Sequence, residues 1–345
     1  MERWLNGVWY DGRAGGVALL PLAALFAAGA ALRRAAFRAG LLRRHRVGVP
    51  VVVVGNLTVG GTGKTPLTQW LAERLAERGR RVGVLCRSYG GRLERPVHVY
   101  AGADPGRCGD EAVLLAGALA HAPGAIVVAG PDRVAGARLL ESLGSEVLLC
   151  DDGLQHYALE RDAEIVVVDG LRGLGNGRLL PAGPLREPPA RLGRADLVVV
   201  NDADAAGPDP AVAARISSLR GRHGAIRMRV TPQSARQLRA PGVVHPLASF
   251  AGTPVHAVAG IGAPERFFAA LERAGLRVVR HPFPDHHPFV PGDLEFGDGH
   301  PVLMTGKDAV KCRAFAQERM WEVTVRPQID AADAALLLSL CARGA

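Results

Sequence analysis

A glycine-rich stretch between a run of valines and a lysine–threonine pair is the segment of the chain best suited to hold phosphate. It reads VVVVGNLTVGGTGKTP over residues 51–66. Backbone N–H groups of such a loop can turn inward onto phosphate oxygens, and a following helix presents its positive N-terminus to the same anion. Lys64 would reach the outer phosphates, and the Thr65 hydroxyl would ligate Mg²⁺. The residues predicted to bind the nucleotide here are Thr58, Val59, Gly60, Gly61, Thr62, Gly63, Lys64 and Thr65.

The loop departs at one position from the P-loop pattern G-x-x-x-x-G-K-[ST], because Thr58 stands where the first glycine is expected. Three glycines at 60, 61 and 63 supply the flexibility instead. An ordinary glycine-rich turn is the alternative. It leaves the preceding strand, the following helix and Lys64 unexplained. Lys64 is one of only three lysines in a chain with 39 arginines, so a lysine kept here indicates a task that arginine cannot perform.

Two pairs of acidic residues are suited to bind a metal ion or to accept a proton. Asp151 and Asp152 follow a predicted strand, where P-loop proteins carry the carboxylate that organises Mg²⁺. A simple turn is the alternative there, and Asp169, which ends another strand, is a weaker candidate for the same role. Asp110 and Glu111 precede a predicted helix. They either cap its N-terminus or provide a general base and a metal ligand.

Other polar residues lie where they could complete such a site. Gln155 follows closely after the Asp151–Asp152 pair, and Arg186 with Glu187 ends a loop rich in proline and glycine. That loop either contacts phosphate or is simply solvated. His286 and His287 lie between prolines in the segment FPDHHPF. Without partners at metal-ligand spacing, we favour a histidine that orients a carboxylate base, and solvated loop histidines remain the alternative.

Short β-branched runs alternate with helical segments from residue 49 onward, which is typical of an α/β fold with a mostly parallel sheet sandwiched by helices. Irregular sequence after residue 201 indicates a linker with short strands near 225–230. The predicted organisation is an amino-terminal helix over 1–46, a P-loop domain over 47–224, a linker over 225–250 and a smaller α/β domain over 251–345. The predicted strands are Val51–Val54, Val82–Cys86, Ala125–Ala129, Glu146–Cys150, Glu164–Val168, Leu197–Val200, Val255–Ala259, Leu276–Arg280 and Val302–Met304. The predicted helices are Leu67–Arg78, Ala112–Ala120, Pro264–Ala274, Asp308–Gln317 and Ala331–Ala342.

An apolar run of 17 residues, Gly16–Leu32, is followed by six arginines before residue 47. A secretory signal would carry its charge before the apolar run, so that class is disfavoured. We favour a helix lying in the membrane interface with arginines on anionic headgroups. A helix packed in the core is one alternative. A true span is the other, although the run is short for it and contains Pro21.

Composition excludes several classes of protein. The chain has 345 residues, a net charge of +9 and 48% apolar residues, which rules out a disordered or collagen-like chain. Aromatic residues make up only 5%, which disfavours a protein that stacks single-stranded nucleic acid. Five cysteines without C-x-x-C spacing indicate neither a zinc site nor a disulfide framework, and favour a reducing compartment.

Seven motifs occur in a fixed order: GNLTVGGTGKTP at 55–66, RSYG at 87–90, GDE at 109–111, DDGLQH at 151–156, LLPAGPLREP at 179–188, FPDHH at 283–287 and TGKDAVK at 305–311. Together they closely resemble the tetraacyldisaccharide 4′-kinase family, the lipid A 4′-kinases. The resemblance covers nearly the whole chain. It implies two α/β/α domains joined by a two-stranded linker, on the cytosolic face of the bacterial inner membrane.

The resemblance also implies an activity and roles for the site residues. The family transfers the γ-phosphoryl group of ATP, with Mg²⁺, to the 4′-hydroxyl of a tetraacylated glucosamine disaccharide 1-phosphate. By motif, Asp110 resembles the catalytic base and His286 its partner, with His287 left open. The residues that fall where the family organises Mg²⁺ and nucleotide are Glu111, Asp151, Asp152 and Gln155, and a further functional pair is matched by Arg186 and Glu187.

The partners implied are the glycolipid acceptor and the inner-membrane surface, with no nucleic acid and no protein partner. Two other activities share the P-loop. A membrane-bound regulatory NTPase would hydrolyse ATP slowly and need no glycolipid. An ATP-dependent ligase would require a second small substrate and an acyl phosphate. Transfer of phosphate to the glycolipid distinguishes the kinase from both.

Overall fold

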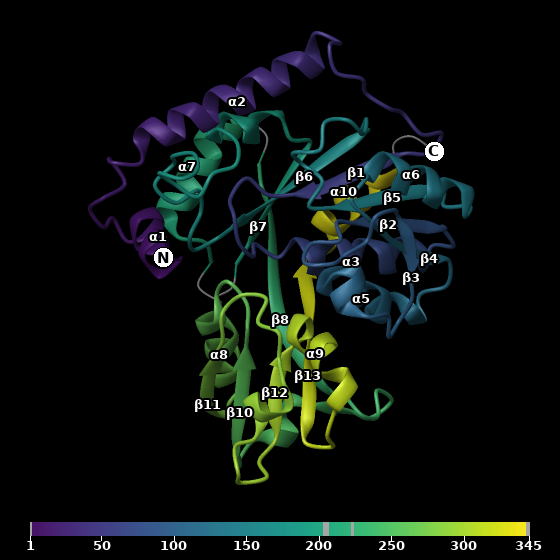
Figure 1. Ribbon diagram of the computed structural model, residues 1–345, viewed down its shortest axis with the longest axis vertical. Coiled ribbons are helices and arrows are strands. Elements are labelled where there is room, and N and C mark those ends of the chain that lie inside the picture. The colour runs from purple at the N-terminus through teal and green to yellow at the C-terminus, as the bar shows by residue number, and fades with distance from the viewer. Residues whose placement is uncertain (1, 203–206, 222–223, 343–345) are drawn as a thin grey trace.

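The computed structural model describes residues 2–202, 207–221 and 224–342 (Figure 1). Its helices are α1 Glu2–Tyr10, α2 Leu20–Arg38, α3 Lys64–Ala76, α4 Pro105–Cys108, α5 Asp110–Ala118, α6 Arg133–Ser142, α7 Pro210–Arg220, α8 Pro264–Arg273, α9 Gly306–Cys312 and α10 Ala331–Ala342. Its strands are β1 Val51–Gly55, β2 Val82–Cys86, β3 Val97–Val99, β4 Ala125–Ala129, β5 Val147–Asp151, β6 Ala163–Asp169, β7 Leu197–Asn201, β8 Ile226–Gln237, β9 Val244–Pro246, β10 Pro254–Ala259, β11 Arg277–Pro282, β12 Val302–Thr305 and β13 Met320–Ile329.

In the described part of the chain, one mixed sheet runs through the whole molecule. Its strand order is β11-β10-β12-β13-β8-β7-β6-β1-β5-β2-β4-β3, with β9 paired to β8. All neighbours are parallel except β13 with β8, β3 with β4 and β9 with β8. The predicted α/β class with a mostly parallel sheet is therefore confirmed.

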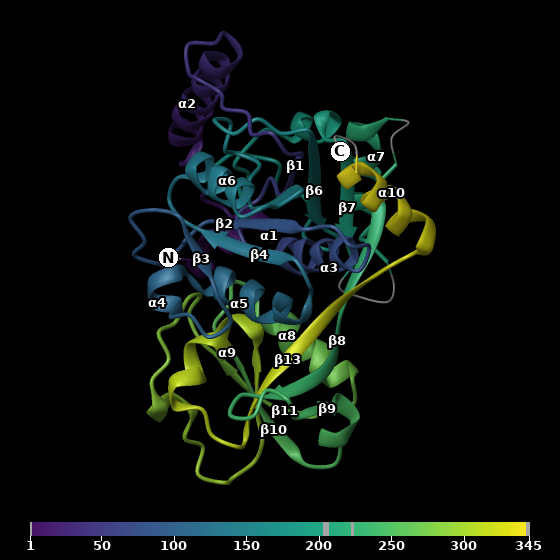
Figure 2. The ribbon, with the colours of Figure 1, turned by 90° about the vertical axis from the view of Figure 1, so that its right-hand side faces the viewer.

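Two groups of elements divide the sheet between them, and we name them for use below. The P-loop unit comprises β1–β7 with α3, α5, α6, α7 and α10. The carboxy-terminal unit comprises β10–β12 with α8 and α9. Figures 1 and 2 show the long strands β8 and β13 running from one unit to the other. These two strands pair antiparallel from Trp321 opposite Gln237 to Ile329 opposite Met228, with a register shift between Thr324 and Val325.

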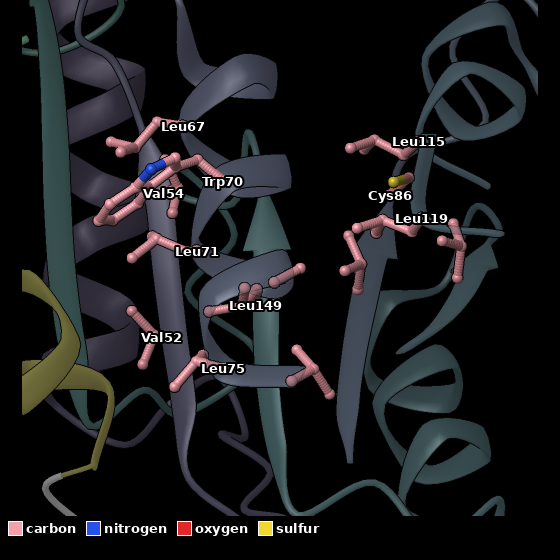
Figure 3. Close-up of a cluster of buried hydrophobic side chains, with 14 of the residues drawn as sticks. Val52, Val54, Leu67, Trp70, Leu71, Leu75, Cys86, Leu115, Leu119 and Leu149 are labelled. Carbon is pink, nitrogen blue, oxygen red and sulfur yellow. The ribbon is translucent and has the colours of Figure 1, made fainter. Parts of the chain in front are cut away.

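The P-loop unit has a hydrophobic core on each face of its sheet. Alternate residues of β1 face opposite sides, so Val52 and Val54 join one core while Val51 and Val53 join the other. Figure 3 shows the first core, where α3 places Leu67, Leu71 and Leu75 against the sheet. Every residue of β1 is buried, as expected for a central parallel strand covered by helices. The strand therefore holds the start of the glycine loop in a fixed position.

Several elements differ from the expectations. Strand β8 is twice the length expected near 225–230, and β13 was not predicted, because charged and proline residues interrupt its apolar pattern. Helix α10 was expected to belong to the carboxy-terminal domain. Instead it returns to the P-loop unit, where Leu337, Leu338 and Leu340 are buried in the same core as α3. Helix α9 ends at Cys312 instead of continuing to residue 317.

Helix α2 lies along the outside of the P-loop unit (Figure 1), and most of its residues are not buried. Its buried residues are Ala23 and Phe37, whereas Leu25 and Leu32 are 70% and 73% exposed. Pro21 falls in the first turn, where a missing N–H costs no hydrogen bond, so it does not interrupt the helix. By length and composition, α2 is the one helix in the described chain that is long and apolar enough to cross a membrane.

Candidate active site

The glycine loop connects buried strand β1 to the first residue of α3, which is Lys64. Gly63 has φ +95°, a conformation that costs glycine little. A Cβ atom at that position would lie 2.5 Å from the Asn201 side-chain nitrogen, which itself donates a hydrogen bond to the Thr62 carbonyl (3.0 Å). On the other side, the Val59 N–H donates to the Pro184 carbonyl (2.9 Å). The loop is therefore held from both sides, and its conformation requires glycine.

Asp151 and Thr65, both predicted to bind metal, meet at the start of α3. The Thr65 hydroxyl donates to Asp151 Oδ2 (2.9 Å), and the Thr68 hydroxyl lies 3.3 Å from Asp151 Oδ1. Burial raises the pKa of Asp151 to about 6, the negative charge of Glu111 adds to the increase, and Lys64 opposes it. The raised pKa marks a buried carboxylate whose charge is only partly balanced by its neighbours.

Asp152 faces the cations of the site. Arg186 donates to both of its carboxylate oxygens (2.7 and 3.0 Å), and Lys64 Nζ lies 3.8 Å from Oδ1. Burial acts to raise the pKa of Asp152, but Lys64 and Arg186 hold it below its usual value. Burial lowers the pKa of Lys64, and Asp152 opposes that change. Arg186 also donates to the Asn56 carbonyl (3.0 Å), so one guanidinium links Asp152 to the loop that follows β1.

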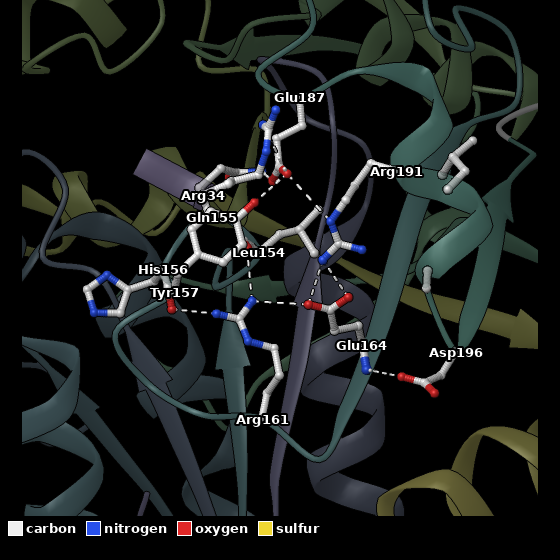
Figure 4. Close-up of polar contacts among 12 residues, drawn as sticks. Arg34, Leu154, Gln155, His156, Tyr157, Arg161, Glu164, Glu187, Arg191 and Asp196 are labelled. Atoms are coloured by element: carbon white, nitrogen blue, oxygen red, sulfur yellow. Dashed lines mark hydrogen bonds and ion pairs between the residues drawn. The ribbon is translucent and has the colours of Figure 1, made fainter. Parts of the chain in front are cut away.

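Glu187 is the centre of a second polar network, shown in Figure 4. It accepts hydrogen bonds from Gln155 Nε2 (3.0 Å) and from the Tyr157 hydroxyl. Arg191 and Arg34 lie 3.5 and 3.8 Å from its Oε2 atom. Burial raises the pKa of Tyr157 to about 12, with Glu187 adding to the increase. Because Arg34 belongs to α2, this network connects the outer helix to the residues behind the glycine loop.

Asp110 and His286 come from different units and meet directly. His286 Nδ1 lies 3.0 Å from Asp110 Oδ2, and Asp110 is only 7% exposed. Burial acts to raise the pKa of Asp110, yet the hydrogen bond from His286 and the charge of Lys307 hold it below its usual value. The same hydrogen bond raises the pKa of His286. The neighbouring His287 points elsewhere, with its Nε2 2.9 Å from Asp293, so the structure places His286 and not His287 against Asp110.

Glu111, next to Asp110, forms an ion pair with Lys307 of α9. Burial acts to lower the pKa of Lys307, but Glu111 overcomes this and raises it above its usual value. Glu111 is predicted to bind metal, and in this structure Lys307 is its ion-pair partner. Lys307 is one of the three lysines of the chain, and its rarity was the signal that could have identified it.

Backbone conformation sets two of these residues apart. Among described residues other than glycine, Asp152 and His286 are the ones with positive φ, +50° and +59°. Such conformations are unfavourable and persist where the surrounding contacts hold them, most often at functional sites. Asp152 is held through its carbonyl by Arg133, which also donates to the Asp151 carbonyl (2.8 Å). Sequence reasoning missed Arg133, because no motif distinguishes it from the other arginines.

The expected metal-binding residues share oxygen chemistry, which is the chemistry that Mg²⁺ prefers. No group of three or more His, Cys, Asp or Glu side chains within the described ranges is arranged as a complete metal site. Mg²⁺ in phosphate-transferring proteins needs no such group, because one or two carboxylates and the substrate phosphates hold it. Asp151 and Thr65 supply oxygen atoms of that kind, and they lie 2.9 Å apart at the start of α3.

A buried strand, a glycine loop, a lysine at the start of a helix and a carboxylate on the adjacent strand together define the P-loop class of α/β proteins. A family model described as tetraacyldisaccharide-1-P 4′-kinase matches residues 16–342. The chain belongs to the tetraacyldisaccharide 4′-kinase family.

Named relatives and a solved structure agree with this assignment. The chain is 51% identical to the tetraacyldisaccharide 4′-kinase of Alkalilimnicola ehrlichii, covering 90% of this chain and 88% of that protein. It is 46% identical to that of Nitrosococcus oceani, covering 98% and 94%. The structure is similar to a crystal structure of LpxK from Aquifex aeolicus in complex with ATP, with a TM-score of 0.73 and 28% identity, covering 95% of this chain and 99% of that chain.

Proposed function

We propose that the chain transfers the γ-phosphoryl group of ATP to the 4′-hydroxyl of a tetraacylated glucosamine disaccharide 1-phosphate, as in lipid A biosynthesis. Its family and its relatives carry the name of this activity, and a similar solved structure is in complex with ATP. The observation that carries the chemistry is the contact of Asp110, in the P-loop unit, with His286 of the carboxy-terminal unit. A regulatory NTPase is not favoured, because the chain matches a kinase family over most of its length.

The glycine loop would hold the phosphates of ATP. Phosphoryl transfer depends on positioning and on neutralising charge more than on covalent chemistry. Backbone N–H groups of residues 60–63 would contact the phosphates, since the Val59 N–H already binds the Pro184 carbonyl. Lys64 would bind the outer phosphates, and Gln155, Arg186 and Glu187 would keep the loop in place through Asn56. This proposal is supported by the hydrogen bonds of Arg186 and Gln155 to the Asn56 carbonyl (3.0 and 3.3 Å).

Thr65 and Asp151 would hold Mg²⁺, with Glu111 and Asp152 as the other predicted ligands, and the ion would supply positive charge to balance that of the phosphates. Asp110 would accept the proton of the sugar hydroxyl as that oxygen attacks the γ-phosphorus. A carboxylate needs to be ionised for this role, and the contacts from His286 and Lys307 favour the ionised form of Asp110. His286 would then keep the carboxylate in the orientation that faces the acceptor.

The acceptor is a lipid, so the protein would work at a membrane surface. The exposed apolar side chains of α2 and the arginines that follow them are suited to the interface of a bilayer with anionic lipids. We place the enzyme on the cytoplasmic face of the bacterial inner membrane, where ATP is available. The acyl chains would stay in the bilayer while the disaccharide reaches Asp110.

A direct transfer assay tests the proposal. The purified chain is incubated with γ-labelled ATP, Mg²⁺ and the disaccharide 1-phosphate lipid, and the labelled position of the product is determined. We expect label on the 4′-oxygen of the lipid and little release of free phosphate. Steady hydrolysis of ATP with no labelled lipid would instead support a regulatory NTPase.

A further inference from the structure

An ion pair joins the two units at a distance from the Asp110–His286 contact. Arg266 of α8, in the carboxy-terminal unit, donates from both terminal nitrogens to the two carboxylate oxygens of Asp169, at the end of β6. Asp169 is 4% exposed and its Oδ1 also accepts from the N–H groups of Leu171 and Arg172, each at 2.9 Å. The Asp169 carboxylate is therefore fixed to the P-loop unit. Its bidentate contact with Arg266 sets both the distance and the angle between the guanidinium and the carboxylate.

In the described part of the chain, polar side-chain contacts join the two units in two separate regions. Figure 1 shows α8 and α9 on opposite sides of the carboxy-terminal unit, with α8 below α1 and α7 and with α9 below α5. On the α9 side, His286 contacts Asp110 and Lys307 contacts Glu111. On the α8 side, Arg266 contacts Asp169. Asp169 was a weaker candidate for metal binding, and in this structure its carboxylate contacts Arg266.

The connection between the two units is a ribbon of two strands. Among the residues that the structure describes, β8 and β13 are the strands that lead from one unit to the other, and their pairing is interrupted between Thr324 and Val325. A two-stranded ribbon of this kind can twist and bend, so it does not by itself determine how the units are oriented. Contacts on both flanks of the ribbon are needed to prevent the carboxy-terminal unit from rotating. A hydrogen bond such as that of His286 to Asp110 weakens steeply with small changes of distance and angle.

We propose that Asp169 and Arg266 are a positioning pair that holds the carboxy-terminal unit so that His286 reaches Asp110. The inference rests on the proposed function, because it concerns the same reaction. Neither residue contacts the glycine loop or Asp110 through a hydrogen bond or ion pair within the described chain. Their effect on catalysis is therefore exerted through His286, and loss of the pair impairs the chemical step without removing any group of the site.

The test compares two leucine substitutions in the same unit. Arg266→Leu removes the pair between the units, whereas Arg280→Leu removes ion pairs to Glu265 and Glu272 that stay within the carboxy-terminal unit. We expect Arg266→Leu to lower kcat for lipid phosphorylation by about tenfold to a hundredfold, the range found when reacting groups are displaced by about 1 Å. The KM for ATP should change little. Arg280→Leu should match the wild type.

A double-mutant cycle shows whether Arg266 acts through His286. If it does, adding Arg266→Leu to a His286→Ala variant lowers kcat by less than threefold further, because the contact it supports is already gone. A nuclear magnetic resonance titration gives a second readout. The pKa of the His286 ring, which Asp110 raises, should fall toward the ordinary histidine value in Arg266→Leu and stay raised in Arg280→Leu.

Two further variants keep the test decisive if Arg266→Leu folds poorly. Asp169→Asn retains an oxygen for the two N–H groups and should lower kcat as Arg266→Leu does, while Arg266→Lys should restore part of the activity. The proposal is overturned if kcat of Arg266→Leu stays within twofold of the wild type. It is also overturned if the losses from Arg266→Leu and His286→Ala multiply, or if Asp169→Asn alone is impaired. If the wild-type chain labels no lipid, the proposed function is refuted. That result differs from failure of the positioning proposal, in which the wild type is active and Arg266→Leu is equally active.

Discussion

Replacing Asp110 by asparagine tests the proposed base most directly, because the two side chains have the same shape. Asparagine can still accept the hydrogen bond that the Glu111 N–H donates to Asp110 Oδ1 (2.9 Å), so the start of α5 should be preserved. What disappears is a carboxylate that His286 and Lys307 keep ionised. The substitution therefore removes the capacity to take up a proton and leaves the shape of the site unchanged.

The expected size of the effect follows from the reaction type. Positioned general bases contribute between about a hundredfold and ten-thousandfold to a rate. Phosphoryl transfer has a loose transition state in which the attacking oxygen is only weakly bonded, so deprotonation is of less help than in acyl transfer. We therefore expect kcat to fall by about a hundredfold to a thousandfold, or about 3–4 kcal/mol in the activation free energy. The KM for ATP should change by less than about threefold, since the hydrogen bonds of the Asp110 side chain in the described chain go to His286 and the Glu111 N–H and not to the glycine loop.

The assay is lipid phosphorylation with labelled ATP at saturating acceptor, beside a matched control. Asp285→Asn removes another carboxylate near the same ring, because Asp285 Oδ1 lies 3.8 Å from His286 Nε2, but it leaves Asp110 unchanged. The control should retain activity within about threefold. The reasoning fails if Asp110→Asn keeps more than a tenth of the wild-type kcat, or if Asp285→Asn is impaired to the same extent.

Three other predictions concern the charges and the helix around this site. Burial gives Asp151 a folded-state pKa of about 6, above the usual 3.8, so its contribution to stability is complete below pH 3.8 and is lost as the pH rises through 6. Chemical denaturation at pH 7.5 should therefore find Asp151→Asn more stable than the wild type, while binding of ATP with Mg²⁺, measured by calorimetry, is weakened. Lys64→Arg should lower kcat for lipid phosphorylation at least a hundredfold although charge is conserved, because a planar guanidinium does not fit the space of a buried ammonium. Leu25→Glu combined with Leu32→Glu should reduce binding to vesicles in sedimentation by at least tenfold and leave the melting temperature unchanged, since both side chains are exposed.

Sequence reasoning performed best where a residue's neighbours lie nearby in the chain. The glycine loop, the strands rich in valine and the acidic residues at the end of β5 all follow from local patterns. The structure places the loop and these acidic residues at the carboxyl ends of the adjacent parallel strands β1 and β5. Strand β13 was missed because Glu322, Arg326 and Pro327 break the alternation that identifies a strand. Pairing with β8 stabilises this segment as a strand although its local pattern does not predict one.

Contacts between distant segments were beyond the reach of local patterns. The motif comparison singled out Asp110 and His286, but nothing in the sequence could decide between His286 and His287. That choice depends on how the loop after β11 turns, including the positive φ of His286. The Asp169–Arg266 pair carries no motif at all, and its two residues are brought together only by the arrangement of the two units.

The return of α10 to the P-loop unit has a consequence for synthesis of the protein. A ribosome makes β1, α3 and the glycine loop early, yet Leu337, Leu338 and Leu340 cover part of the same core and emerge only after the whole carboxy-terminal unit. Until then, an apolar surface beside α3 stays open to water and to other chains. Nascent chains that stall after β13 should thus be prone to aggregation and depend on chaperones. Release of α10 from the ribosome then completes the core of the P-loop unit in a single late step.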